Sequence, residues 1–316
     1  MPQPLQNWLP LEDIQNFLFL SGFEVIKKNY RLLFPKRIPW LSSFFNRFLA
    51  KLPLIRKLCL VEWVIAKPVG EPEDARSVSS SVVIPCRNEK GNIKEVVRRT
   101  PTMGRSTELV FVDGASTDGT VEEIERVQRE YPDRNIRLIH QGQPNGKCDA
   151  IHKGFARATG DLFLILDADL TVAPEDLPKF FDALVKGKGE FINGTRMVYP
   201  MERQAMRWLN ILGNKFFGSV FTYLLEQRFT DTLCGTKAFW KRSYEKLRRE
   251  RSYFGNFDPF GDFELIFGAS KLNLKILELP VRYHERSYGT TKIRRFIHGW
   301  LLLKVSWIAI KKLKFV

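Results

Sequence analysis

Five consecutive apolar residues, Leu162–Leu166, run directly into the triplet Asp167-Ala168-Asp169. An apolar run of this length, preceded by the turn Thr159-Gly160-Asp161, is typical of a fully buried strand. A chain of 316 residues is long enough to bury such a strand in a sizeable core. The strand therefore belongs at the centre of a sheet, with two carboxylates one residue apart at its carboxyl end.

The two carboxylates have two interpretations. As hard oxygen ligands at a sheet edge, Asp167 and Asp169 can share one divalent cation with a diphosphate. Alternatively, an Asp-x-Asp triplet can simply start a turn or cap the next helix, here near Pro174-Glu175-Asp176. The residues upstream decide between these interpretations.

Strands and helices alternate regularly around this run. Apolar segments predict strands at residues 82–85, 109–112, 136–140 and 162–166. Helices are predicted between them, at residues 92–100, 120–131 and 150–158. Repeated β-α units predict an α/β fold with a mostly parallel sheet and helices on both faces. Sheets of this kind bind ligands beyond the carboxyl ends of their strands.

Polar residues stand at those strand ends. Glu89 follows the first strand, Asp113 ends the second, and Asn145-Gly146-Lys147 opens the helix before the fourth. Carboxylates can accept hydrogen bonds from a nucleobase or ribose, whereas a lysine and a helix N-terminus suit phosphate. Taken singly, Lys147 is explained as well by a solvated lysine, and Asp118-Gly119 by a turn before a helix. Their ordered occurrence at successive strand ends favours a nucleotide site.

The motifs in this order resemble family 2 glycosyltransferases, most closely the polyprenyl- and dolichyl-phosphate sugar transferases. They are Val-Val-Ile-Pro-x-x-Asn-Glu, Val-Asp-x-x-Ser-Thr-Asp-Gly-Thr, Gly-Lys-x-x-Ala and Leu-Asp-Ala-Asp-Leu, and the resemblance covers residues 81–292. It implies a GT-A (Rossmann-like) fold, a UDP- or GDP-sugar donor, Mg²⁺ or Mn²⁺, and inverting transfer.

The resemblance also implies residue roles. Pro85, Glu89 and Asp113 would hold the nucleoside, while Asp167 and Asp169 would hold metal and diphosphate. Family members often carry a second acidic residue after the one that matches Asp113, where this chain has Gly114. The choice between UDP and GDP therefore stays open.

Three further segments point to the acceptor half of the site. Residues 231–239 resemble a stretch of dolichyl-phosphate glucosyltransferases, with Thr236 in place of an aromatic residue. Arg286 and Lys292 flank a glycine in a basic loop, and both suit phosphate oxygens. Asp262 is the candidate base for a hydroxyl acceptor. A lipid phosphate needs no base, and Asp262 could then position the acceptor or cap the helix at residues 263–271.

The net charge of +15 calls for an anionic partner. Nucleic acid is disfavoured because no zinc-finger, basic-zipper or RNA-binding signature is present. Residues 206–225 and the basic amphipathic segment 294–316 instead favour an anionic membrane surface, although both could be core or dimer helices. No signal peptide or spanning segment is visible, and the four scattered cysteines indicate a reducing compartment. A peripheral location on the cytoplasmic face of a membrane is expected.

Residues 1–67 lie outside the glycosyltransferase pattern. They resemble the C-terminal end of a class I methyltransferase, but lack the glycine loop that would hold S-adenosylmethionine. Residues 31–60, rich in Phe, Leu and basic residues, could instead face a membrane. The predicted organisation is therefore an α/β remnant at 1–67, a linker at 68–80, a GT-A domain at 81–293 and an amphipathic helix at 294–316.

The expected activity is metal-dependent, inverting sugar transfer to a polyprenyl phosphate. Transfer to a glycan hydroxyl in cell-envelope polysaccharide synthesis and a non-catalytic lipid-binding scaffold are the alternatives. Sugar-nucleotide synthesis is disfavoured because the Gly-rich N-terminal loop with an arginine is missing. The sequence leaves the sugar and the oligomeric state open.

Overall fold

The computed structural model of the chain describes residues 9–143, 146–199, 208–249, 262–286, 288–289 and 295–314. The chain divides into two compact units, Met1–Gly70 with Ile310–Val316, and Glu71–Ala309. The predicted site residues within the described ranges all belong to the second, larger unit.

The smaller unit is built on a two-stranded antiparallel sheet. Its elements are α1 (Leu11–Leu20), β1 (Phe23–Arg31), α2 (Leu41–Arg47), η1 (Leu49–Lys51), η2 (Ile55–Leu58), β2 (Val61–Pro68) and the π-helix η5 (Ile310–Lys314). Few apolar side chains are buried here: Leu11, Ile26 and Ala50 among the described residues. A sheet of two strands buries little apolar surface, so this core is small. The likeness to a methyltransferase end remains a prediction.

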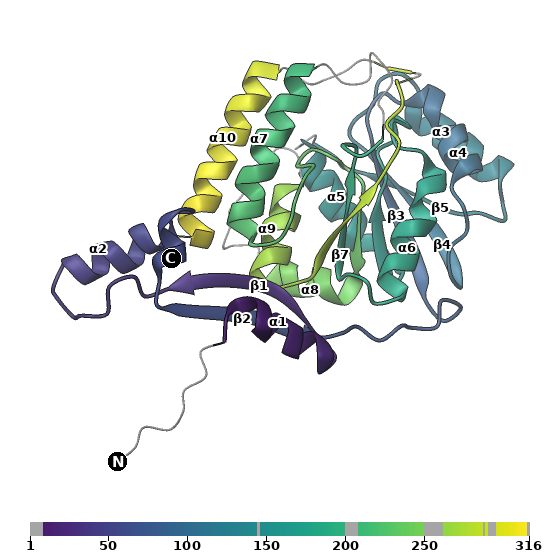
Figure 1. Cartoon of the computed structure of the whole chain (residues 1–316). Helices are drawn as coiled ribbons and strands as arrows, with labels where there is room; N and C mark the ends of the chain where they lie inside the picture. The colour runs from purple at the N-terminus through teal and green to yellow at the C-terminus, as the bar shows by residue number, and fades with distance from the viewer. Residues whose placement is uncertain are drawn as a thin grey trace. The chain divides into compact units, whose positions relative to one another are not determined.

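The larger unit contains a seven-stranded sheet in the order β5-β4-β3-β6-β8-β7-β9 (Figure 1). Its strands are β3 (Ser79–Cys86), β4 (Ser106–Asp113), β5 (Asn135–His140), β6 (Leu162–Ile165), β7 (Phe191–Thr195), β8 (Lys237–Trp240) and β9 (Ile276–Pro280). Only β8 runs antiparallel to its neighbours. The predicted mostly parallel sheet is therefore confirmed.

Helices cover both faces of this sheet. They are α3 (Lys90–Arg99), α4 (Thr120–Glu130), α5 (Gly146–Arg157), η3 (Pro174–Asp176), α6 (Leu177–Val185), α7 (Trp208–Leu225), α8 (Lys241–Arg249), α9 (Phe263–Lys271) and α10 (Arg295–Ala309).

Successive side chains of a strand point to opposite faces of the sheet, where they pack against the helices that cover each face. Val82 and Ile84 of β3 belong to the apolar cluster that includes α3, α4 and α6. Val83 points to the other face, where a Cβ on Gly154 of α5 would overlap it. On that face Phe155 stacks on Phe163 of β6 with ring centroids 4.9 Å apart. β3 therefore has apolar side chains on both of its faces, as a strand buried on both sides requires.

Two apolar helices, α7 and α10, lie side by side (Figure 1). The C-terminal part of α10 buries Leu302 and Val305 and exposes Trp300, Leu303 and Trp307. Residues three and four apart share one helix face, so the exposed aromatic residues form a stripe. Among the described residues, neither these helices nor any other has the length and hydropathy to span a bilayer.

Candidate active site

Three adjacent strands bring the predicted donor residues together. In the register of β3 and β4, Pro85 lies beside Val112 and Cys86 beside Asp113. β6 pairs with the other edge of β3 and leads into Asp167. Because these strands are parallel, their carboxyl ends meet at one edge of the sheet, where ligands bind in such folds.

The predicted nucleoside half of the site is pre-arranged by short-range hydrogen bonds. Asp113 is buried, and both of its carboxylate oxygens accept from the Ser116 backbone N–H at 3.3 Å. Glu89 is also buried, and its Oε2 accepts from the Asn92 amide at 2.8 Å. The Glu89 backbone N–H donates to Thr120 Oγ1 at 3.0 Å, which fixes the turn into α3.

Asn88 ties the two loops of this half together. Its backbone adopts a positive φ of 55°, a conformation that asparagine tolerates better than most residues. Its Oδ1 accepts from the Thr117 N–H at 2.8 Å, while its own N–H donates to Ser116 Oγ at 2.9 Å. The β3 and β4 loops are thus held as one surface. Asn88 is not among the predicted site residues.

The two carboxylates after β6 each face a cation. Lys147 at the start of α5 lies 2.6 Å from Asp167 Oδ1. Arg286 forms an ion pair with Asp169 Oδ2, and its Nη1 lies 3.9 Å from Glu89 Oε1. The other oxygen of Asp169 accepts from the Thr171 hydroxyl at 2.7 Å and from its N–H at 3.1 Å. These two hydrogen bonds stabilise a turn after β6, as the alternative interpretation of the triplet predicted.

The charges of this cluster stabilise one another. Burial by itself lowers the pKa of the Lys147 ammonium, but the carboxylates of Asp167 and Asp262 outweigh burial and raise that pKa above the ordinary value. Burial likewise opposes the Asp167 carboxylate, yet Lys147, Lys237 and Arg286 together lower its pKa. Both groups are therefore charged at neutral pH.

Asp262 accepts a hydrogen bond from the Nζ of Lys237 at 2.8 Å, and both side chains are buried. Asp262 stands at the N-cap position of α9, but its side chain makes no capping hydrogen bond there. Asp262 is thus the N-cap residue by position, as one interpretation predicted, but its carboxylate pairs with Lys237 instead of capping the helix. Lys237 is not among the predicted site residues, although a lysine at the start of the apolar strand Lys237–Trp240 is a signal for a buried charge.

Gly235 brings the loop before β8 against the donor half. A Cβ at this position would overlap the Asp167 carboxylate and approach Lys147 Nζ. Only glycine lets this backbone pass so close to a carboxylate. Gly235, like Asn88 and Lys237, is not among the predicted site residues.

The basic loop is described in part. Arg286 pairs with Asp169. The Tyr288 hydroxyl donates to Asp118 Oδ2 at 3.3 Å, and Gly289 lies beside Glu89. The predicted phosphate ligand Lys292 lies outside the described residues.

A buried ion pair beneath the acceptor segment was not anticipated. Arg196 donates to the two Asp231 carboxylate oxygens at 2.7 and 2.8 Å, and Asn214 of α7 donates to the same carboxylate at 2.9 Å. Burial opposes the Asp231 charge, but Arg196 outweighs it and lowers the pKa to about 2. This network connects the end of β7, the helix α7 and the loop that leads to Gly235.

The residues present fit a divalent metal with a diphosphate. Asp167 and Asp169 offer hard carboxylate oxygens, and the Asp167 side chain remains one-third exposed, at 33%. Lys147 and Arg286 lie against these carboxylates and carry the charges that phosphate oxygens need. The donor set contains only oxygen ligands, which suits Mg²⁺ or Mn²⁺.

Comparison with known proteins agrees with this geometry. Residues 81–249 match the family model of glycosyl transferase family 2. A dolichol-phosphate mannosyltransferase of Saccharomyces cerevisiae is 39% identical over 113 residues, which cover 34% of this chain and 42% of that protein. An undecaprenyl-phosphate 4-deoxy-4-formamido-L-arabinose transferase of Edwardsiella ictaluri is 29% identical over 220 residues, or 67% of this chain and 62% of that protein. The aligned region thus spans less than two thirds of either relative.

The solved structures agree on the fold. A glucosyl-3-phosphoglycerate synthase from Mycobacterium tuberculosis, in complex with Mn²⁺, UDP and glucosyl-3-phosphoglycerate, superimposes with a TM-score of 0.54 at 17% identity. The match covers 75% of this chain and 80% of that one. At this identity the likeness shows the fold alone, and it confirms the predicted GT-A architecture.

Proposed function

Because this chain belongs to glycosyltransferase family 2, we propose that it transfers a sugar from a nucleoside-diphosphate sugar to a polyprenyl phosphate. One observation carries the proposal: the Asp167 and Asp169 carboxylates lie beside Lys147 and Arg286, next to the strand ends that hold Glu89 and Asp113. The proposed acceptor is a polyprenyl phosphate because the relatives are a dolichol-phosphate mannosyltransferase and an undecaprenyl-phosphate sugar transferase.

In this proposal the donor half holds the nucleotide. Glu89 and Asp113 accept hydrogen bonds from the nucleoside, with Pro85 forming the strand surface beside them. Asp167 and Asp169 hold Mg²⁺ or Mn²⁺, which would supply positive charge against the charge that grows on the leaving diphosphate. The Mycobacterium tuberculosis relative binds Mn²⁺ and UDP, which supports a divalent metal. Lys147 and Arg286 bind the phosphate oxygens, joined by Lys292 from the basic loop.

Inversion requires the acceptor to attack the anomeric carbon from the side opposite the diphosphate. A polyprenyl phosphate oxygen is already ionised at neutral pH, so no protein group needs to remove a proton. We assign Asp262 a positioning role in this reaction, oriented by its ion pair with Lys237. If the acceptor is instead a sugar hydroxyl, the same carboxylate is the group able to act as general base.

The acceptor's lipid tail suits a peripheral membrane enzyme. The exposed apolar stripe of α10, formed by Trp300, Leu303 and Trp307, has the composition of a helix that lies in a membrane interface. The net charge of +15 favours anionic lipids, each nearby basic residue contributing about 1 kcal/mol. We therefore propose that this chain binds the cytoplasmic face of a membrane through α10.

Nucleoside-diphosphate release tests the proposed reaction. A panel of UDP- and GDP-sugars is incubated with Mg²⁺ or Mn²⁺, with and without a polyprenyl phosphate in detergent, and with a chelator as control. Release that needs both metal and lipid phosphate is expected, and it identifies the donor at the same time. Chelator-sensitive release that ignores the lipid would move the acceptor to a glycan hydroxyl. Absence of release with every donor would favour a scaffold without catalysis.

A further inference from the structure

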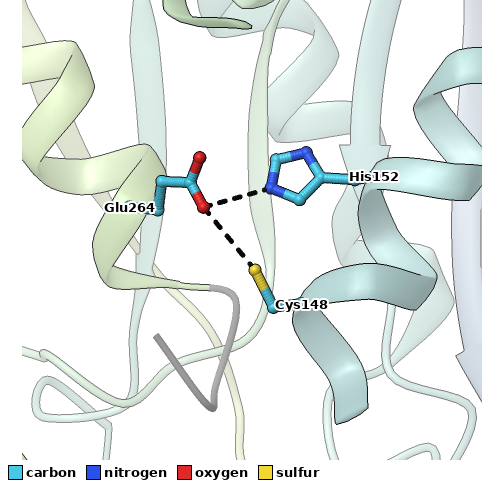
Figure 2. Close-up of side chains that lie close together, drawn as sticks. All are labelled: Cys148, His152 and Glu264. Atoms are coloured by element: carbon cyan, nitrogen blue, oxygen red, sulfur yellow. Dashed lines mark hydrogen bonds and ion pairs between the residues drawn. The ribbon is translucent and has the colours of Figure 1, made fainter. Parts of the chain in front are cut away.

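We propose that Cys148, His152 and Glu264 form a second metal site, selective for Zn²⁺ and related transition metals. The site is separate from the all-oxygen pair Asp167 and Asp169, and none of its three ligands contacts the donor or the acceptor in the proposed transfer. It contains a thiol, an imidazole and a carboxylate whose ligand atoms all lie within 4.8 Å of one another (Figure 2).

The helix period brings the first two ligands together. Cys148 and His152 are four residues apart on α5, so both project from one face of that helix. Glu264 lies in the first turn of α9 and points toward them, as Figure 2 shows. The His152 and Glu264 side chains are only 11% and 10% exposed. The imidazole and the carboxylate are therefore largely shielded from solvent, while Cys148 is of intermediate exposure.

Two of the three distances between ligand atoms match a tetrahedral zinc centre, and the third, between Cys148 and His152, lies within 4.8 Å. Glu264 Oε2 lies 3.3 Å from His152 Nε2 and 3.7 Å from Cys148 Sγ. Zinc bonds of about 2.3 Å to sulfur and 2.0–2.2 Å to nitrogen and oxygen, at tetrahedral angles, separate those ligand pairs by about 3.4 and 3.6 Å. Glu264 thus already lies at zinc-binding distance from both other ligands, and a tetrahedral ion would leave the fourth position for water.

Tyr244 of α8 completes the arrangement behind the imidazole. Its hydroxyl lies 2.7 Å from His152 Nδ1, and the two rings stack with centroids 5.9 Å apart. A hydroxyl that accepts the Nδ1 proton leaves the lone pair of Nε2 directed at the other two ligands. Metal-bound histidines generally have their second nitrogen held by such a partner.

The ligand types decide which metal fits. Thiolate and imidazole favour zinc over magnesium, whereas the carboxylates of Asp167 and Asp169 favour the reverse. The three ligands are also close in sequence to two charged residues of the candidate active site. Cys148 follows Lys147 directly, and Glu264 is two residues after Asp262. An ion here would fasten α5 to α9 and so fix the distance between those two charged residues.

Metal binding to the purified full chain tests the site. After chelation and dialysis, Zn²⁺ is titrated against a chromophoric competitor, and Co²⁺ is added separately as a spectroscopic probe. We expect one Zn²⁺ per chain, a tetrahedral cobalt spectrum with thiolate charge-transfer absorption, and a higher Tm with Zn²⁺. Cys148→Ser should lose the thiolate absorption and lower zinc affinity about 100-fold or more. Tyr244→Phe should lower the affinity roughly 10-fold, since it removes only the orienting hydroxyl.

Two controls keep the outcome specific. Cys59→Ser removes a thiol of the smaller unit and should leave zinc affinity and the cobalt spectrum unchanged. Circular dichroism of each variant separates loss of the site from loss of the fold. Zinc affinity unaffected by Cys148→Ser, or a cobalt spectrum without thiolate absorption, would overturn the proposal. The three side chains would then be a hydrogen-bonded network between α5 and α9.

Discussion

At the scale of single residues, Gly235 allows the loop before β8 to approach the Asp167 carboxylate closely. Because an added Cβ would overlap the Asp167 carboxylate, Gly235→Ala must displace either that carboxylate or the loop. A displacement of about 1 Å at a reacting centre can cost roughly 100-fold in rate. We expect Gly235→Ala to lower kcat/KM for nucleoside-diphosphate release by about that factor.

The chain contains a matched control for this substitution. A Cβ on Gly213 in α7 would meet no heavy atom within 4 Å. Gly213→Ala should therefore retain activity and stabilise the helix by roughly 0.5–1 kcal/mol. Equal activity of the two variants would show that the approach of Gly235 to Asp167 has no bearing on turnover.

Asp262 distinguishes the two acceptor classes at the same scale. The amide oxygen of Asp262→Asn can still accept from Lys237, but the amide cannot act as a base, and the buried Lys237 loses its counter-charge, so the folded state of the variant is checked by circular dichroism. If the acceptor is a polyprenyl phosphate, the variant should keep kcat within about tenfold, because loss of a general base costs 10²–10⁴-fold. Steady-state kinetics with saturating lipid phosphate measures this, and a drop beyond about 100-fold would favour a hydroxyl acceptor.

At the scale of elements, the Asp231 network joins β7, α7 and the loop before β8. The carboxyl pKa falls from its ordinary 3.8 to about 2, so the stability it contributes is present above pH 3.8 and is lost as the pH falls through 2. That contribution amounts to about 2 kcal/mol. Asp231→Asn also leaves the buried Arg196 without its counter-charge, and should cost about 3 kcal/mol at pH 7.

Denaturant unfolding at several pH values tests this effect. The difference between wild type and Asp231→Asn should be constant above pH 4 and shrink between pH 4 and 2. Asp182→Asn breaks an exposed pair with Lys186 and should change stability little at any pH. A difference that does not depend on pH would contradict the pKa of Asp231.

The helices and strands also show which parts of the fold could be predicted from the sequence. Apolar runs and strand-end carboxylates predicted β3, β4, β5 and β6 and the positions of Asp113 and Asp167, because buried parallel strands have a local signature. The helix predicted to open at Asn145-Gly146-Lys147 does begin at Gly146, as α5. The Arg196–Asp231 pair and the Lys237–Asp262 pair join residues 35 and 25 positions apart. Such pairings depend on tertiary packing, which no local pattern records.

At the scale of the whole molecule, net charge and exposed aromatic residues together predict membrane binding. Trp300 is 71% exposed and Trp307 57%, on one face of α10. Since large apolar side chains and surface charge both contribute to interfacial binding, we expect Trp300→Ser with Trp307→Ser to lower the affinity for anionic vesicles about tenfold or more. Flotation with phosphatidylserine vesicles measures it, and higher salt should weaken the binding of both proteins.

Trp40→Ser is the informative comparison, because Trp40 is 91% exposed and lies in the smaller unit. If α10 carries the contact, Trp40→Ser floats like wild type while the double variant remains at the bottom of the gradient. The reverse pattern would assign the membrane contact to residues 31–60, the segment whose Phe, Leu and basic residues also suit a lipid surface. Equal flotation of all three proteins would leave only the net charge of +15 as the source of binding, and that binding should then disappear at high salt.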